Sequence, residues 1–149
     1  MKQAKRCIAA GLVCLAGVMI ISDAQGQNNG VETIPWRRCL SQSPEFYATA
    51  EAVRIADNVL LYRRDTGGWS KNVDMARVLS EQDKALLREA KEREDSTFDN
   101  GATHTQIRYL AKVYNAAGLE RVRRAIISAI DYMLDAQYDN GGWPQSYPS

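Results

Sequence analysis

A polar, glycine-containing loop occurs three times in this chain and limits the folds that it can adopt. Loops at residues 65–72 and 139–146 share the pattern Asp-x-Gly-Gly-Trp, then a small or ring residue and a long polar side chain. A central loop at residues 95–106 contains Asp-Asn-Gly at positions 99–101, so Asp-x-Gly recurs after 34 and 40 residues. Such spacings are typical of helical repeats. We call these segments the first, last and central glycine loops.

Signals for four helices flank the glycine loops. Residues 43–45 (Ser-Pro-Glu) are typical of a helix start, and apolar residues continue at helical spacing to residue 62. A capping box at residues 80–83 predicts a second helix, and further helices are expected over residues 103–118 and 119–137. No alternating strand pattern follows the first 24 residues, so the sequence predicts an all-α fold. The apolar sets expected in the second and fourth helices are Ala85, Leu86, Leu87 and Ala90, and Val122, Ile126, Ala129, Ile130, Met133 and Leu134.

The N-terminal segment is typical of a signal peptide. Basic residues at positions 2, 5 and 6 precede an apolar run over residues 7–21, and small residues stand at positions 22 and 24. We expect cleavage after Ala24, secretion to the periplasm or the medium, and no stable membrane insertion afterwards. Residues 25–42 are then expected to form an extended N-terminal arm.

Charge and cysteine content exclude several classes of function. Loss of residues 1–24 removes three basic residues and Asp23, which leaves a nearly neutral chain. A neutral chain argues against nucleic acid as a partner, because phosphate binding requires clustered Lys and Arg. Cys39 remains as a single thiol, which allows no internal disulfide, and a zinc site would need more ligands than Cys39 and His104.

The central glycine loop concentrates the polar chemistry. The Asn100-Gly101 pair allows a chain reversal, and Thr103 or Thr105 would cap the following helix. Asp99 would then lie near a helix N-terminus, where its ionised form is favoured. A capping role alone would be the simpler interpretation for one such loop, but the loop recurs.

The first glycine loop adds two further side chains to consider. If the repeats are in phase, Lys71 lies on the same side as Asp99 and is able to receive a carboxylate; otherwise it is an ordinary solvated lysine. For Trp69, beside two glycines, we favour a structural anchor over a platform for sugar stacking.

Residues 97–111, flanked by 67–72 and 138–145, resemble the family 10 polysaccharide lyases, which are pectate lyases built as an (α/α) toroid. The match runs from about Pro44 to the C-terminus, with Ser70 where the family usually has proline. The family's toroid needs more helices than four, so we expect residues 43–149 to form an incomplete (α/α) toroid or barrel, a fragment of a longer catalytic domain. The resemblance implies β-elimination of polygalacturonate with Ca²⁺ and an arginine base further along the toroid.

The resemblance also assigns candidate site residues. Asp99 matches the family's functional acid and is expected to be catalytic and to bind calcium, and Lys71 is expected to contact uronate. For His104 we favour an orienting role over that of a base, and Asp139 is either a cleft carboxylate or a turn cap. Weaker candidates for substrate or metal contacts are Asn100, Thr103 and Arg108.

Three functions stay open at this point. The first is a secreted pectate lyase or its front part, the second is a non-catalytic uronate-binding module, and the third is an inverting glycoside hydrolase on a similar helical barrel. Because the resemblance places the base elsewhere, we expect this chain alone to have little or no activity. The sequence makes no prediction of oligomeric state.

Overall fold

The computed structural model of the chain describes residues 33–148. No strand is present in this range, where one isolated bridge joins Thr97 to Ser146. The all-α class is therefore confirmed. The α-helices are α1 (Ala50–Tyr62), α2 (Glu81–Glu89), α3 (His104–Ala117) and α4 (Glu120–Asp135), and the 3-10 helices are η1 (Trp36–Ser41), η2 (Pro44–Ala48), η3 (Ala90–Glu92) and η4 (Asp99–Gly101).

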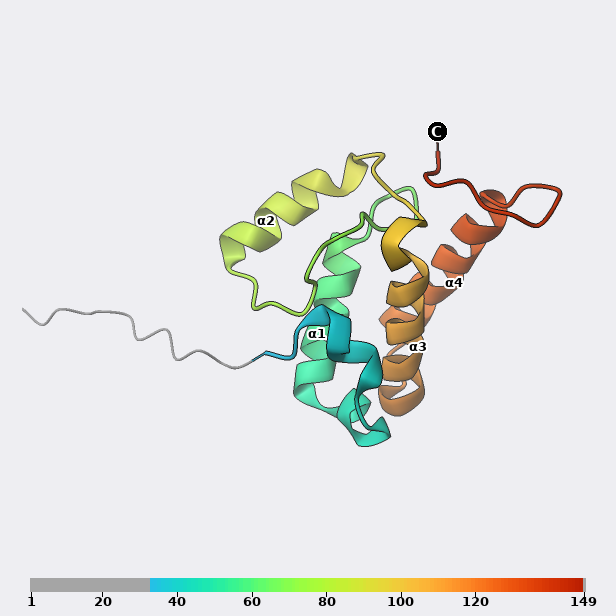
Figure 1. Cartoon of the computed structure of the whole chain (residues 1–149). Helices are drawn as coiled ribbons and strands as arrows, with labels where there is room; N and C mark the ends of the chain where they lie inside the picture. The colour runs from blue at the N-terminus through green and yellow to red at the C-terminus, as the bar shows by residue number, and fades with distance from the viewer. Residues whose placement is uncertain (1–32, 149) are drawn as a thin grey trace, which may run out of the picture. The chain divides into compact units, whose positions relative to one another are not determined.

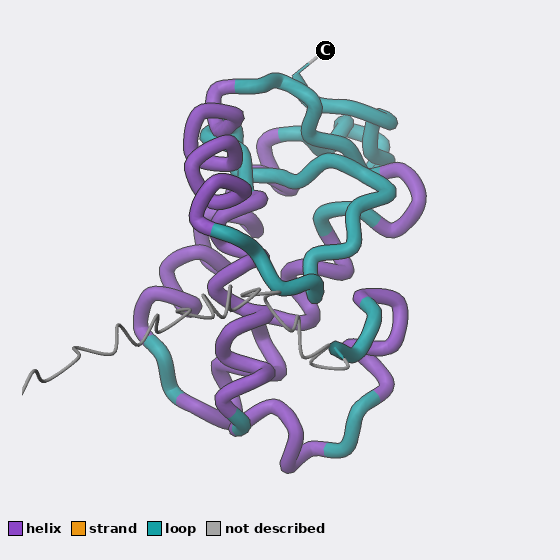
Figure 2. Tube along the Cα trace, turned by 90° about the vertical axis from the view of Figure 1, so that its left-hand side faces the viewer, coloured by secondary structure: helices purple, strands orange, loops and turns teal. Residues whose placement is uncertain are grey.

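The three longest helices pack together and place the glycine loops at one end. Helix α3 packs against both α1 and α4 (Figure 1). Figure 2 shows much of the loop backbone gathered at one end of these helices. Helices α1 and α4 end there and α3 begins there, so all three glycine loops share that end. The common end that the repeat pattern required is present.

Local capping explains where the helices begin and end. Ser80 and Asp83 form the predicted capping box of α2, and Gly118 ends α3 in the left-handed conformation with a φ of 64°. The single helix expected from residue 43 to residue 62 is divided, however, into η2 and α1. Thr49 divides it, because its extended backbone and its hydroxyl, which accepts the N–H of Ala52 at 3.2 Å, start a new helix.

The buried faces of α2 and α4 differ from those expected. Helix α2 buries no residue, and Leu86 is 56% exposed. In α4 the expected Ile130 and Leu134 are exposed, so these two assignments are wrong. Val122 and Ala129 are buried as expected, and Ala125 and Tyr132 are buried in place of the bulkier residues. The buried residues of α4 are Val122, Ala125, Ala129 and Tyr132.

The segment expected as an extended arm is described from Thr33 onward, and Trp36–Ser41 is helical (η1) rather than extended. The Trp36 ring packs edge-on against Tyr109, with ring centroids 5.3 Å apart. Cys39 is fully buried, and burial raises the pKa of its thiol to about 12, so the thiol remains protonated. Cys39 is therefore a packing residue, and η1 belongs to the folded unit.

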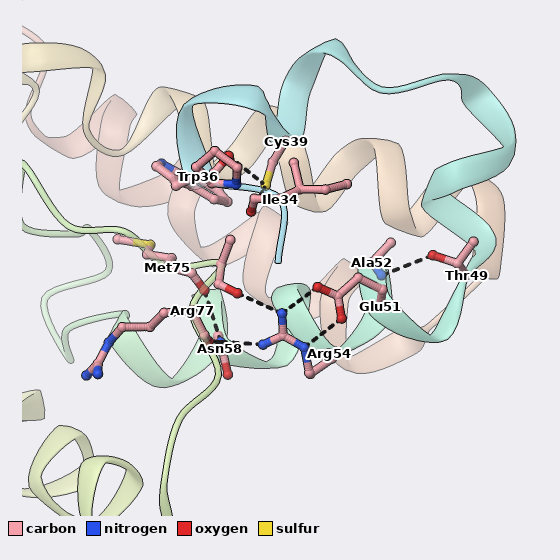
Figure 3. A network of polar contacts seen from close by, with 12 residues as sticks. Ile34, Trp36, Cys39, Thr49, Glu51, Ala52, Arg54, Asn58, Met75 and Arg77 are labelled. Carbon is pink, nitrogen blue, oxygen red and sulfur yellow. Dashed lines mark hydrogen bonds and ion pairs between the residues drawn. The ribbon is translucent and has the colours of Figure 1, made fainter. Parts of the chain in front are cut away.

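A network of polar contacts holds the segment after the first glycine loop against helix α1 (Figure 3). The Arg54 guanidinium pairs with Glu51 at 2.7 Å and donates to the carbonyl oxygens of Ala76 and Arg77 at 2.7 and 3.0 Å. The buried Asn58 amide donates to the Met75 and Arg77 carbonyl oxygens at 3.0 and 2.8 Å. Residues 75–77 are thus held in place directly after the segment that carries Lys71.

The expected signal peptide, residues 1–24, lies outside the described residues. In the range from 33 to 148, no helix combines the length and the apolar character that a membrane crossing needs.

Candidate active site

The first glycine loop is anchored by its tryptophan. Trp69 is fully buried, and its indole N–H donates to the Val59 carbonyl oxygen at 2.7 Å. Backbone hydrogen bonds between Arg64 and the two glycines close the turn, in which Gly67 has a φ of 113° that favours glycine. Trp69 is therefore a structural anchor, in agreement with the interpretation favoured from the sequence.

The central glycine loop has an unusual backbone. Asn100 and Gly101 have φ values of 48° and 79°, so the predicted reversal is present, and Thr103 has a φ of 63°, which is rare for a β-branched residue. The Thr103 hydroxyl does not cap α3 as expected. It donates to the Thr97 carbonyl oxygen at 2.9 Å and accepts a hydrogen bond from the backbone N–H of Trp69 at 3.3 Å. Because Thr103 is fully buried, it connects two glycine loops instead of facing a ligand.

Side chains from all three glycine loops converge on the carboxylate of Asp99. The Lys71 ammonium lies 2.5 Å from Oδ2, and the Gln145 amide donates to the same oxygen at 3.0 Å. Oδ1 accepts the backbone N–H of Asn100 at 2.9 Å, and the Asn100 side chain donates to Asn72 Oδ1 at 3.2 Å. Lys71 and Asp99 therefore share one site, as the repeat pattern predicted.

This ion pair sets the charge of Asp99. The pKa of the Asp99 carboxyl lies below its ordinary value. The main cause is Lys71, followed by the backbone N–H of Asn100 and, to a smaller extent, Gln145. The carboxylate therefore stays ionised at neutral and mildly acidic pH and gains a proton only below that ordinary value. The side chains of Lys71 and Asp99 remain 39% and 33% exposed, so a ligand can reach both.

Two hollows meet at the ion pair. Lys71 lines the larger hollow, of about 540 Å³, which extends to η1. Asp99 lines the second, of about 490 Å³, together with Trp143 and Gln145 of the last glycine loop. Trp143 is 44% exposed, unlike the buried Trp69. An exposed aromatic ring beside charged groups offers a surface for the apolar face of a sugar.

Residues 63–149, which contain all three glycine loops, match the family model described as pectic acid lyase. The chain belongs to the pectic acid lyase family. Among solved structures, a family 10 polysaccharide lyase from Cellvibrio cellulosa is 32% identical, with a TM-score of 0.54 over 76% of this chain. An aspartate-to-alanine mutant of the family 10 lyase from that organism, in complex with trigalacturonic acid, is also 32% identical, with a TM-score of 0.56 over 76% of this chain.

The chain spans only 30% and 31% of the length of those two Cellvibrio chains. The resemblance to family 10 polysaccharide lyases that the motifs indicated is thus confirmed. No curated protein matches the chain.

Gln145 is a residue at the Asp99 ion pair that was not predicted from the sequence. It stands two residues after Trp143, as Lys71 stands two residues after Trp69. Both side chains contact Oδ2 of Asp99. Their equivalent places in the repeated motif are the sequence signal that identifies Gln145 once Lys71 is chosen.

Tyr132 of α4 was also missed, and it contacts the first and central glycine loops and Tyr147, which directly follows the last one. Gly67 and Gly68 pack so closely on Tyr132 that an added Cβ at either would lie 2.7 Å from its side chain. The Tyr132 ring stacks on Phe98 with centroids 5.4 Å apart, and its hydroxyl donates to the Tyr147 carbonyl oxygen at 2.6 Å. Burial raises the Tyr132 pKa to about 12, so the hydroxyl remains a donor.

Three other candidate residues make no hydrogen bond or ion pair with Lys71 or Asp99 in the described part of the chain. Arg108 and His104 are exposed on α3, and Asp139 is exposed in the last glycine loop. None of the three lines either hollow. Within the described chain, none makes a side-chain hydrogen bond or ion pair that would orient it toward Asp99.

The oxygen donors at this site fit calcium in kind. Asp99 offers one carboxylate and Asn72 an amide oxygen nearby, which are ligand types that Ca²⁺ prefers, whereas the Gln145 amide presents its nitrogen to Asp99. Between residues 33 and 148, no group of three or more Asp, Glu, His or Cys side chains is placed to hold a metal. A shell of about six to eight oxygens would therefore need further ligands, to which substrate carboxylates can contribute.

Proposed function

We propose that this chain forms part of the substrate cleft of a calcium-dependent pectate lyase that cleaves polygalacturonate by β-elimination. The observation that carries the proposal is the convergence of Lys71 and Gln145 on Asp99, in a chain of the pectic acid lyase family. The trigalacturonic acid bound to the Cellvibrio lyase supports an acidic sugar polymer as the substrate.

The reaction requires neutralisation of a uronate carboxylate. A base removes the C5 proton next to that carboxylate and the oxygen on C4 leaves, and a cation near the carboxylate makes the proton more acidic. Lys71 carries such a cation and is paired with Asp99 in the free chain. We propose that the uronate carboxylate replaces Asp99 as the partner of Lys71. The side chains of Asn72 and Asn100 then remain as donors and acceptors for sugar hydroxyls.

Asp99 is the residue that we assign to calcium. A calcium ion, when bound, supplies further positive charge next to the uronate carboxylate. Once Lys71 turns to the substrate, Oδ2 of Asp99 loses its closest partner and becomes available as a ligand. The arginine base that the family resemblance implies is assigned to no residue of this chain, because the resemblance places it further along the toroid. Export follows from the proposed substrate, since such a polymer does not cross a membrane.

The function is tested by adding polygalacturonate to the chain in the presence of calcium. We expect retention of the chain in a pectate-containing gel, with little or no ultraviolet absorbance from unsaturated uronide, because the base is assigned elsewhere. Strong absorbance that EDTA abolishes would show that the base lies within this chain. Release of reducing ends without the chromophore would favour a hydrolase, and absence of retention would contradict the proposed substrate.

Asp99→Ala tests the two roles proposed for the ion pair. Without calcium, the substitution removes a negative charge and leaves Lys71 without its competitor, so we expect trigalacturonate to bind about threefold to tenfold more tightly. With calcium present, the same variant lacks the metal ligand, and we expect binding about tenfold weaker than that of the unmodified chain. Isothermal titration calorimetry with calcium or with EDTA measures both affinities.

Asp139→Ala is the matched control for this experiment. Asp139 begins the same Asp-Asn-Gly sequence in the last glycine loop but lines neither hollow. Its replacement should leave both affinities unchanged. If Asp99→Ala weakens binding equally with calcium and with EDTA, the assignment of Asp99 to calcium is wrong.

A further inference from the structure

The larger hollow at the ion pair extends well beyond Lys71 and Asn72. Its other wall is formed by η1, with Trp36, Arg37 and Leu40. This wall precedes residue 63, where the match to the pectic acid lyase family begins. The volume of about 540 Å³ lies within the range of small-molecule sites, so the hollow has room for a ligand in addition to one held at Lys71.

A buried amide with an unused acceptor lines the hollow. Gln106 of α3 is only 3% exposed, and its Oε1 has no hydrogen-bond partner in the described chain. Its Nε2 makes one weak contact, with the sulfur of Met75 at 3.7 Å. Buried polar side-chain atoms normally have hydrogen-bond partners, and an unmade bond destabilises the fold. The Gln106 amide is therefore suited to a ligand that carries hydroxyl groups, which both donate and accept.

The charges around the hollow suit an acidic ligand. Arg37 is exposed and makes no ion pair with any residue between 33 and 148. Asp74 is the acid that lines the hollow, and its Oδ1 already accepts the backbone N–H groups of Trp36 and Ala76 at 3.2 and 3.0 Å. Lys71 stands at the end near Asp99. Arg37 thus offers a second, separate cation for a carboxylate, and Trp36 offers an apolar aromatic wall.

We infer that this hollow is a further uronate subsite, which binds a galacturonate unit of the same polymer beyond the unit held at Lys71. In this subsite Arg37 pairs with the sugar carboxylate, Gln106 bonds a sugar hydroxyl, and Trp36 contacts the apolar face of the ring. The inference rests on the proposed function. It requires an unesterified uronate at this position, since a methyl ester would remove the charge that Arg37 recognises.

Calorimetric titration of the chain with tri- and hexagalacturonate tests the subsite. The hexamer should bind more tightly than the trimer, because we place the trimer at Lys71 and over the hollow lined by Asp99 and Trp143, so that only the longer ligand also enters the subsite. Arg37→Ala should weaken hexamer binding about threefold to tenfold and leave trimer binding nearly unchanged. Arg38→Ala is the matched control, because Arg38 is the exposed neighbour that lines a different hollow, and it should retain the full hexamer affinity.

Gln106→Leu supplies a second test that does not confuse binding with folding. Leucine fills a similar volume and removes the unpartnered amide, so the melting temperature should be maintained or raised while the hexamer loses affinity. Equal affinity of the unmodified chain for trimer and hexamer would overturn the subsite and leave the proposed function standing. Equal losses of hexamer affinity in Arg37→Ala and Arg38→Ala would have the same meaning. Failure of both oligomers to bind would overturn the proposed function and the subsite together.

Discussion

Replacing Trp69 with alanine should lower the free energy of unfolding by about 3–5 kcal/mol. The indole is fully buried against α1, and its removal would leave a void there. It would also leave the Val59 carbonyl oxygen without its donor and remove the ring over which the Arg63 guanidinium lies at 5.8 Å. Because the total stability of a domain is about 5–15 kcal/mol, much of the chain should unfold at moderate temperature. Urea denaturation followed by circular dichroism measures the change.

Trp143→Ala is the control for Trp69→Ala, since both residues end the same Asp-x-Gly-Gly-Trp motif. Trp143 is 44% exposed, so its loss should reduce the free energy of unfolding by about 1 kcal/mol or less. Its effect should instead be on ligand affinity, because it lines the hollow that contains Asp99. Equal destabilisation by the two substitutions would contradict the different roles assigned to the two tryptophans.

Replacing Gly67 with alanine should lower the free energy of unfolding by about 2–5 kcal/mol. One part is backbone strain, because Gly67 has a φ of 113°. The other part is overlap, because the new methyl group would lie 2.7 Å from the Cβ of Tyr132. The first glycine loop must then move away from α4 and take Lys71 with it. Trigalacturonate affinity should therefore fall together with stability.

Gly141→Ala separates strain from overlap. Gly141 is the first glycine of the equivalent motif and also has a positive φ, of 83°, but the atom nearest to an added Cβ is Nε2 of Gln137, 3.9 Å away. Only the strain remains, which costs about 1–2 kcal/mol. If Gly67→Ala proves no more destabilising than Gly141→Ala, close packing on Tyr132 does not hold the first glycine loop.

The helix ends could be predicted from the sequence because they depend on capping interactions between neighbouring residues. The capping box at Ser80 and the left-handed glycine at Gly118 depend on neighbouring residues alone, and both are present in the structure. The division at Thr49 is local as well, but the preceding Ser-Pro-Glu start concealed it. Ser43 and Thr49 are both able to cap a helix, and in the structure only the Thr49 hydroxyl does so.

The buried face of α4 could not be predicted from neighbouring residues in the same way. Hydrophobicity favoured Ile130 and Leu134, whereas the structure buries small alanines and Tyr132. Which stripe faces the core depends on how closely α4 approaches α3 and the glycine loops, and that distance is a property of the assembled fold.

The site was partly predictable because the repeated loops carry its charged groups. The placement of Lys71 on the same side as Asp99 was expected from the repeat phase, whereas the direct ion pair between them is seen only in the structure. Thr103 was expected to contact a ligand or cap α3, but its hydroxyl bonds across to the first glycine loop and is buried. A contact between two distant loops leaves no local signature, so Thr103 could not be assigned from its own motif.

The contacts of Tyr132 also affect how the region around the ion pair tolerates sequence change. One aromatic ring contacts Gly67, Phe98 and Tyr147, which lie near Lys71, Asp99 and Gln145 on three separate segments. Substitutions in different segments that shift this ring should therefore have non-additive effects. Selection acting on any one segment is consequently constrained by the other two.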